Sequence, residues 1–306
     1  MNSAKIVMPL SRRNGIAMVL TAGVLWGISG SVAQYLFQQQ GYSPEWLVVI
    51  RLLTSGLILL GFAYKKEKQK IWEIWKHKVE RRNLLIFGIL GMLAVQYTYF
   101  VAIKQSNAAT ATILQYLAPV MITCFLAIRS HRFPTLKEIV AVGLALLGTF
   151  FLVTHGSISS LSISGLALFW GLISAVTLAF YTLYPHKLLV NWGATIVVGW
   201  AMLIGGIGFS LVHPPWKFEG QWSVSTILAV LFIILFGTLI AFYCYLESLN
   251  YLSASETSLL ACVEPLSSAF LSVIWLHVNF GLLEWLGSLC ILSTIVILSV
   301  VKEKRS

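Results

Sequence analysis

The sequence has 306 residues, of which 58% are hydrophobic and 10% are charged, with a mean hydropathy of +0.84 and a formal net charge of +10. So little polar surface cannot cover a soluble globule of this length, which excludes a soluble domain and places the chain in lipid. The four cysteines lie in apolar runs without paired spacing, so we expect packing residues and not a disulfide or metal set.

Ten mainly apolar runs follow one another, each near the roughly 20 residues that a membrane-crossing helix needs. They lie near residues 15–36, 45–63, 84–103, 108–128, 134–153, 163–184, 194–212, 226–248, 254–276 and 281–301. The runs are continuous, unlike the alternating strands of a membrane barrel. The predicted fold class is therefore all-α: a polytopic membrane protein with ten transmembrane helices.

The basic residues are distributed unevenly between the two sides of this predicted topology. Of the 21 Lys and Arg residues, 18 fall at the termini and in alternate connections on one side, whereas Lys104 and Lys217 alone fall on the other. By the positive-inside rule, we expect both termini in the cytoplasm and the chain in the cytoplasmic membrane. The net charge thus indicates membrane topology and not nucleic acid as a partner.

The first run contains Trp26 and the glycines Gly23, Gly27 and Gly30, whose lack of side chains lets a neighbouring helix approach closely. The stretch from Gly27 to Gly30 also has the GxSG form that intramembrane serine proteases use for their nucleophile, here Ser29. That chemistry needs a histidine at the same depth, and all six histidines fall in loops or at the ends of runs. Packing is therefore the favoured interpretation of these glycines.

The second run contains Arg51, about six residues from its outer end. A charge inside the bilayer costs roughly 2.5–3.5 kcal/mol or more unless it is paired or hydrated, so it marks a functional-site hypothesis by default. Two interpretations compete here. Arg51 binds an anionic group of a substrate, or it is a structural charge satisfied by a carboxylate or by carbonyls at a helix end.

The connection at residues 65–83 combines eight basic residues with apolar residues at helical spacing. The apolar residues are Ile71, Trp72, Ile74, Trp75 and Val79. This pattern predicts a short amphipathic helix lying on the anionic cytoplasmic leaflet.

The third and fourth runs carry an unusual density of hydrogen-bonding side chains for lipid, some of which must join helices. They are Gln96, Tyr97, Tyr99, Thr110, Thr112, Gln115 and Tyr116. Pro119 follows near mid-membrane, where it removes a backbone donor and predicts an interrupted helix.

The acidic residues of the last three runs differ in depth. Glu247 and Glu256 lie near cytoplasmic ends and Glu284 near an outer end, where water reaches them. Glu264 lies eleven residues into its run, next to Pro265, and the chain has no aspartate. A carboxyl at that depth is either protonated or paired with a cation.

The stretch from Tyr97 to Pro119 returns 146 positions later as Tyr243 to Pro265. The same offset continues through His131 and His277 and through Glu138 and Glu284. We therefore predict two five-helix repeats, residues 1–154 and 155–306. Because five is odd, the halves enter the membrane from opposite sides, which is the inverted-repeat design of secondary transporters with a ligand site near the midplane.

The sequence resembles the EamA-type members of the drug/metabolite transporter superfamily. The resemblance is carried by the LWG motif at residues 25–27, by Arg51, by the repeated Pro119 and Pro265, and by the plan of five plus five helices. It implies an inner-membrane carrier of small metabolites such as amino acids and amines, many relatives being exporters, without cofactors. Many relatives have a glutamate soon after the fourth and ninth helices, where this chain has His131 and His277.

These observations predict a secondary transporter that moves an amino acid, an amine or a related compound by alternating access. Glu264 is expected to recognise an amine or to take part in proton coupling, and Arg51 to balance charge or meet a carboxylate. The residues expected to shape the pocket are Trp26, Tyr97, Gln115 and Tyr243. A channel-like facilitator and an intramembrane enzyme are the alternatives. No selectivity-filter repeat, HExxH motif or metal-ligand cluster favours either of them.

Overall fold

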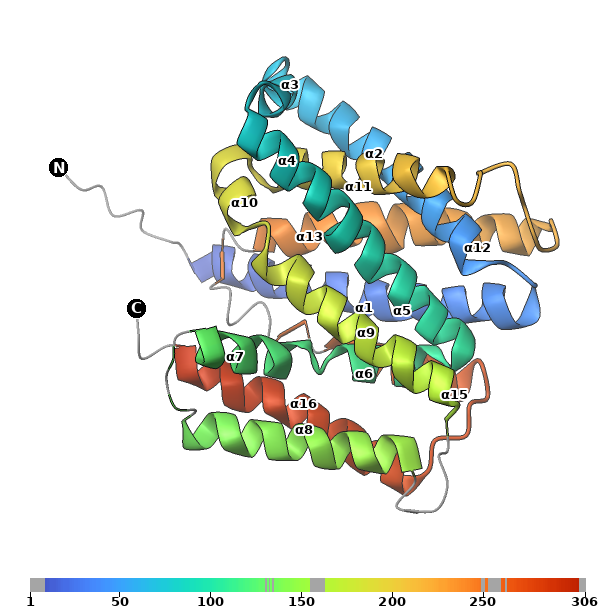
Figure 1. Cartoon of the computed structure of the whole chain (residues 1–306). Helices are drawn as coiled ribbons and strands as arrows, with labels where there is room; N and C mark the ends of the chain where they lie inside the picture. Colours follow the sequence, from blue (N-terminus) through green and yellow to red (C-terminus); the bar gives the residue numbers. More distant parts are fainter. Residues whose placement is uncertain are drawn as a thin grey trace.

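The computed structural model describes residues 9–129, 131, 133, 135–154, 163–248, 251–252, 260–261 and 263–302. All regular structure within these ranges is helical, which confirms the predicted fold class (Figure 1). The first part forms α1 (Pro9–Gln39), α2 (Pro44–Glu67), α3 (Lys70–Glu73), the 3₁₀ turn η1 (Ile74–Lys76), α4 (Lys78–Ile86), the π-helical η2 (Phe87–Leu93), α5 (Ala94–Gln105), α6 (Ala108–Gln115), α7 (Ala118–Arg129) and α8 (Leu136–Thr154). The second part forms α9 (Gly165–Leu183), α10 (His186–Trp192), α11 (Ala194–Ser210), α12 (Val224–Ile234), the π-helical η3 (Leu235–Ile240), α13 (Ala241–Ser248), α15 (Val263–Ile274) and α16 (Leu282–Lys302).

Within the described ranges, six helical stretches are long and apolar enough to cross a bilayer. They cover Arg12–Gln39, Pro44–Glu67, Lys78–Gln105, Ala108–Arg129, Gly165–Leu183 and Val224–Tyr245. The shorter apolar helices are Ala194–Ser210, Val263–Ile274 and Leu282–Thr294. The chain is thus a multi-pass membrane protein, whereas the count of ten spans stays a prediction.

Several helices begin at a side chain that caps their first turn. The Ser43 hydroxyl accepts from the Trp46 amide at 3.2 Å, and Asn107 accepts from the Thr110 amide at 2.8 Å. Ser164 caps α9, and Ser223 forms a capping box with Thr226 at the start of α12. These caps satisfy amides that a helix end would otherwise leave without partners, so each turn between helices has a defined end.

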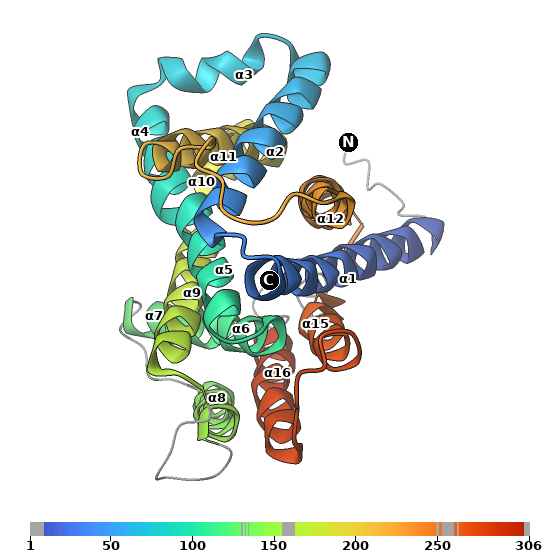
Figure 2. The same cartoon turned by 90° about the vertical axis from the view of Figure 1, so that its right-hand side faces the viewer.

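The helices pack in an arrangement that repeats between the two parts of the chain. Helix α1 contacts α13 and α15, while α9 contacts α5 and α6 in the corresponding way. In two further pairs, a helix contacts its counterpart in the other part of the chain: α2 contacts α11, and α8 contacts α16. The two pairs lie on opposite sides of the molecule (Figures 1 and 2). This pattern of contacts is the one that a two-fold axis in the membrane plane produces.

Two backbone irregularities recur at the offset of 146 found in the sequence. The π-helical segments η2 and η3 overlap at this offset, and His131 and His277 adopt left-handed turns with φ of 47° and 52°. Histidine tolerates this conformation better than β-branched residues do. The repeat therefore extends to details of backbone geometry.

Glycines set the distance between the paired helices α2 and α11. A Cβ on Gly56 would lie 2.9 Å from the backbone nitrogen of Leu203, and a Cβ on Gly206 would lie 3.0 Å from that of Leu53. The two contacts are reciprocal, because each glycine packs against a leucine of the other helix. Such close approach is how membrane helices gain packing energy without a hydrophobic driving force.

The connection at residues 65–83 differs from its prediction. Ile71 and Ile74 are 3% and 0% exposed, and the Trp200 indole of α11 donates to the Ile71 carbonyl at 2.8 Å. The Trp72 and Trp75 rings lie 5.0 Å from the Trp200 ring. The prediction that this apolar face lies on the leaflet is wrong for Ile71 and Ile74, because α11 covers them.

We expect Gly56→Ala to destabilise the protein and Gly61→Ala, one turn further along α2, not to do so. The first Cβ meets backbone atoms that cannot move aside, and overpacking of this kind costs about 1–3 kcal/mol. The second meets nothing within 4 Å and gains up to about 1 kcal/mol of helix propensity. Thermal unfolding of both purified variants in detergent checks this. Equal melting temperatures would mean that the α2–α11 contact is loose.

Candidate functional site

Helix α1 runs through the middle of the molecule, with α12 on one side of it and α15 on the other (Figure 2). It also contacts α5, α6, η3 and α13, so it is the element on which both parts of the chain meet. Its glycines permit this contact, since a Cβ on Gly27 would lie 2.7 Å from the Glu264 carbonyl oxygen. The predicted role of these glycines in close packing is confirmed. Ser29 is also a packing residue, because it lies buried against Gly237 of η3.

Glu264 lies in the first turn of α15, where it faces α6 and α1. The Tyr116 hydroxyl donates to Glu264 Oε2 at 3.0 Å and lies 3.1 Å from the Ala261 carbonyl oxygen. Tyr116 belongs to the short turn at residues 116–117 that separates α6 from α7. The tyrosine that holds the carboxyl therefore comes from the interruption in the fourth predicted span.

The two repeated prolines lie in the first turns of the helices that follow. Pro119 is the second residue of α7, and Pro265 is the third residue of α15, where it is buried. Proline is tolerated there because the first turn of a helix has no intrahelical acceptor for its amides. The helix break between α6 and α7 thus falls immediately before Pro119.

Arg51 lies buried between α2, α5 and η3. Its Nε donates to Thr238 Oγ1 at 2.7 Å, an Nη donates to the Gly237 carbonyl at 3.4 Å, and the guanidinium lies 5.2 Å from the centre of the Phe100 ring. A π-helical turn leaves backbone groups without the usual partners, and Arg51 satisfies one of them. Two of its five N–H groups make these bonds, so others remain for a ligand.

Arg51 is buried, whereas Tyr99 and Glu264 are half-buried, and the three side chains lie in one polar region. The Tyr99 hydroxyl is 2.7 Å from Thr112 Oγ1. Among the described residues, no ion pair within 4 Å joins Arg51 to Glu264. A buried guanidinium and a half-buried carboxyl thus share one region without contacting each other.

The predicted pocket residues lie in different places. Trp26 packs on Phe242 and Tyr245 with ring centres 5.4 and 5.2 Å apart, which joins α1 to α13. Gln115 is buried as the last residue of α6, one position before Tyr116. Tyr243 is 62% exposed on α13, so the structure does not bring it to the others.

Tyr97 also lies apart from Glu264, in contact with α2, α9 and α11. Its hydroxyl donates to Glu45 Oε1 at 3.0 Å, and its ring packs on Trp170 and Phe209. Trp170 and Gly171 repeat Trp26 and Gly27 at an offset of 144, a signal that would have pointed to this contact.

The site contains polar groups that sequence analysis did not select. Thr238 and Phe100 hold Arg51, and no pattern in the sequence distinguishes them from neighbouring residues. Further along α15, the Ser268 and Ser272 hydroxyls are buried and have no hydrogen-bond partner among the described residues, which is costly unless a ligand or water bonds them. Glu256 and Cys262 lie outside the described residues. In the described part of the chain, no three His, Cys, Asp or Glu side chains gather as a metal site would require.

Comparisons with known proteins agree with this architecture. The model of the EamA-like transporter family matches residues 13–154 and again residues 165–300. An uncharacterized inner membrane transporter of Salmonella typhimurium, YicL, is 42% identical over 299 residues, which are 97% of this chain and 98% of that protein. The threonine/homoserine exporter RhtA of the same species is 27% identical over 248 residues, 80% of this chain and 78% of that one.

A solved crystal structure has the same fold, with a TM-score of 0.61 at 18% identity over 96% of this chain and 99% of that one. The two matches of the family model together cover most of the 306 residues. The chain therefore belongs to the EamA-like transporter family, within the drug/metabolite transporter superfamily, and is a membrane transporter.

Proposed function

We propose that the protein is a secondary transporter that exports a small zwitterionic metabolite, an amino acid or a closely related amine, by alternating access. The observation that carries the proposal is the pair of opposite charges, the half-buried Glu264 and the buried Arg51, which lie in one region without contact between them. Charges inside a membrane are costly when no opposite charge pairs with them. A ligand that carries both charges offsets the cost at both positions.

In this proposal each charge recognises one end of the ligand. Glu264, positioned by Tyr116, accepts hydrogen bonds from the ammonium group, and the N–H groups of Arg51 that make no bond to the protein bind the carboxylate. Charge-assisted hydrogen bonds of this kind are about twice as strong as neutral ones. The unpartnered hydroxyls of Ser268 and Ser272 are suited to a polar side chain of the ligand. The name of the relative RhtA, an exporter of two hydroxyl-bearing amino acids, supports this substrate class.

Trp26 and Gln115 act at the edge of the proposed site. Trp26 holds α1 against α13, and Gln115 is the last residue of α6, directly before Tyr116, whose hydroxyl positions Glu264. Tyr97 connects α5 to Glu45 at the start of α2 and is proposed to fix the distance between these helices. Tyr243 has no role in the proposed site because of its exposure.

Alternating access would arise from the two repeats, residues 1–154 and 155–306, which exchange roles between inward-open and outward-open states. The π-helical segments and the break before Pro119 are the places where such helices bend. Both termini are proposed to be cytoplasmic, from the distribution of basic residues. Protons are the proposed coupling ion, with Glu264 releasing its proton when an ammonium binds.

Counterflow in proteoliposomes tests the proposal. Vesicles loaded with a mixed pool of amino acids, amines and carboxylates are diluted into isotope-labelled members of each class, and mass spectrometry records which are exchanged. We expect exchange of amino acids and their closely related amines, and no exchange of the carboxylates that lack an amino group. Leakage of every solute at one rate would indicate a channel, and chemical conversion of a solute would indicate an enzyme. Raised tolerance of producing cells to a toxic amino acid analogue would establish the export direction.

We expect Glu264→Gln to reduce exchange by about 10- to 100-fold. The variant keeps the shape of the side chain and the contact with Tyr116 but removes the charge, and a hydrogen bond to a charged group contributes about 1.5–3 kcal/mol. Glu73→Gln, an exposed acid on α3, is the matched control and should exchange like the native protein. Full activity of Glu264→Gln at every pH would remove this residue from both proposed roles.

Arg51→Lys should distinguish the two interpretations of Arg51. Lysine keeps the charge and cannot reproduce the planar fork that binds a carboxylate. If Arg51 binds the carboxylate, we expect the apparent KM for the amino acid to rise about 10-fold or more, and that for the corresponding amine to change little. An equal loss for both compounds, together with a lower melting temperature, would show that Arg51 only supports η3 through Thr238 and Gly237.

A further inference from the structure

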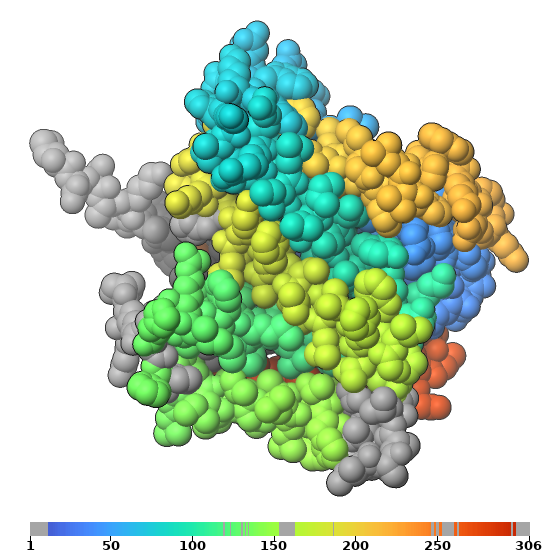
Figure 3. Space-filling view, viewed as in Figure 1, coloured from blue at the N-terminus to red at the C-terminus, as the bar shows by residue number. Residues whose placement is uncertain are grey.

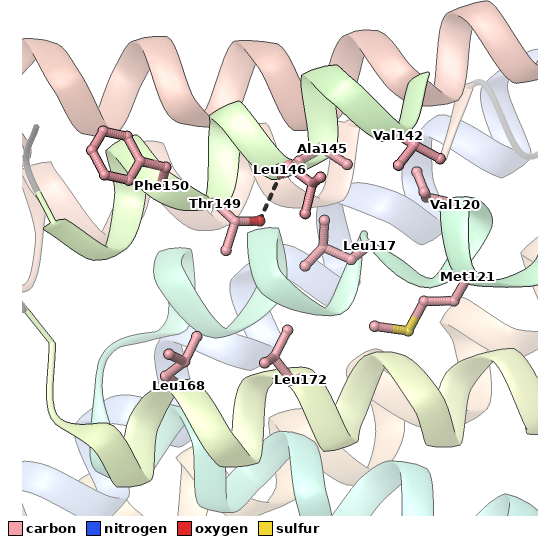
Figure 4. Close-up of a pocket in the computed structure, with 10 residues that line it drawn as sticks. All are labelled: Leu117, Val120, Met121, Val142, Ala145, Leu146, Thr149, Phe150, Leu168 and Leu172. Carbon is pink, nitrogen blue, oxygen red and sulfur yellow. Dashed lines mark hydrogen bonds between the residues drawn. The ribbon is translucent and has the colours of Figure 1, made fainter. Parts of the chain in front are cut away.

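A groove lies between α7, α8 and α9, on the face of the molecule drawn in Figure 3. Its volume is about 410 Å³, and Figure 4 shows the side chains of the three helices pointing into it. They are Leu117, Val120, Met121, Val142, Ala145, Leu146, Thr149, Phe150, Leu168 and Leu172. The groove is separate from the charges of the proposed transport site, since it contains neither Arg51 nor Glu264.

The lining of this groove suits a hydrocarbon. Nine of its ten residues are apolar, and the remaining hydroxyl, on Thr149, donates to the Ala145 carbonyl at 2.8 Å within α8. An occupant therefore finds no group that needs a hydrogen bond. The groove opens beside Leu146 and Phe150, which are 68% and 37% exposed on α8, a helix that the sequence predicts to cross the bilayer. Lipid acyl chains are the apolar molecules present at that surface.

The end of the groove that leads out of the bundle carries positive charge. Arg129 is the last residue of α7 and Lys137 the second residue of α8, and both are exposed. Lys137 precedes the groove residue Val142 by five positions, about 7.5 Å along the helix. Within the described residues, no carboxylate forms an ion pair with either side chain. Both side chains are therefore available to an anionic group whose attached chain enters the groove.

A second groove at the related position of the other repeat lacks this charge. It has a volume of about 460 Å³ and is lined by Val24, Ile28, Leu266, Ser267, Phe270 and Leu271 between α1 and α15. Leu266 and Ser267 correspond to Val120 and Met121 at the offset of 146. No Lys or Arg occurs between residues 263 and 301, so the second groove lacks basic residues at the end that corresponds to Arg129 and Lys137.

We propose that the groove between α7, α8 and α9 binds one acyl chain of an anionic phospholipid whose phosphate lies on Arg129 and Lys137. The apolar lining binds the chain through van der Waals contacts, and the two basic residues select the head group. The site is structural and does not depend on the proposed substrate.

Native mass spectrometry of the detergent-purified full chain tests this proposal, with phosphatidylglycerol and phosphatidylethanolamine of identical chains as probes. We expect the first phosphatidylglycerol to bind at least about fivefold more tightly than phosphatidylethanolamine. Arg129→Gln with Lys137→Gln should abolish that difference. Lys65→Gln with Lys66→Gln, two exposed lysines at the end of α2, is the matched control and should preserve it.

A second variant tests the groove itself. Thr149→Trp fills the groove from α8, and we expect it to weaken binding of the first phosphatidylglycerol about tenfold while Arg129 and Lys137 remain. Equal affinity for the two lipids, or native affinity in either test variant, would overturn the proposal. Because lipid binding is measured without transport, these outcomes are independent of whether an amino acid is exchanged in proteoliposomes.

Discussion

The structure depends on a constraint that lipid imposes: a backbone polar group without a helical partner must find one inside the protein. This chain interrupts its helices near the middle of the bundle, at η3 and before Val263. Arg51 donates to the Gly237 carbonyl of η3, and the Tyr116 hydroxyl lies within hydrogen-bonding distance of the Ala261 carbonyl. In both cases a side chain from the first half of the chain satisfies irregular backbone in the second half.

The same two side chains also bring the charged groups into place. Tyr116 holds the Glu264 carboxyl, and Arg51 is itself the buried cation. The side chains that satisfy the irregular backbone therefore also place the charges of the site. The two halves of the chain do not contribute equally to these charges. At the offset of 146, Ala118 corresponds to Glu264 and Met92 corresponds to Thr238. In the proposed mechanism the two-fold arrangement supplies two related conformations, whereas Glu264 comes from the second half alone.

Much of this architecture could be predicted from the sequence because it depends on residue type alone. Apolar length predicted the helices, the glycines predicted the contact between α1 and its neighbour, and the repeat of Pro119 as Pro265 pointed to the middle of the bundle. The directions of side chains could not be predicted in this way. A π-helical turn adds one residue, which rotates the following helix by about 100° and makes a 3.6-residue period unreliable across η3. Sequence analysis did not select Thr238 in η3, which bonds Arg51, and it expected Tyr243 after η3 to shape the pocket, whereas the structure exposes that side chain.

The two related grooves lie where a lipid bound at the protein surface can affect the conformational equilibrium of the transporter. One groove lies where α9 meets α7, and the other where α1 meets α15, so each follows a contact between the two halves. Alternating access requires these contacts to exchange their geometry, and a ligand shifts such an equilibrium only if it binds the two states unequally. A phospholipid that fills one groove and not its counterpart meets this condition. The charge difference between the grooves would then make the lipid composition of the membrane one of the factors that set the resting state of the transporter.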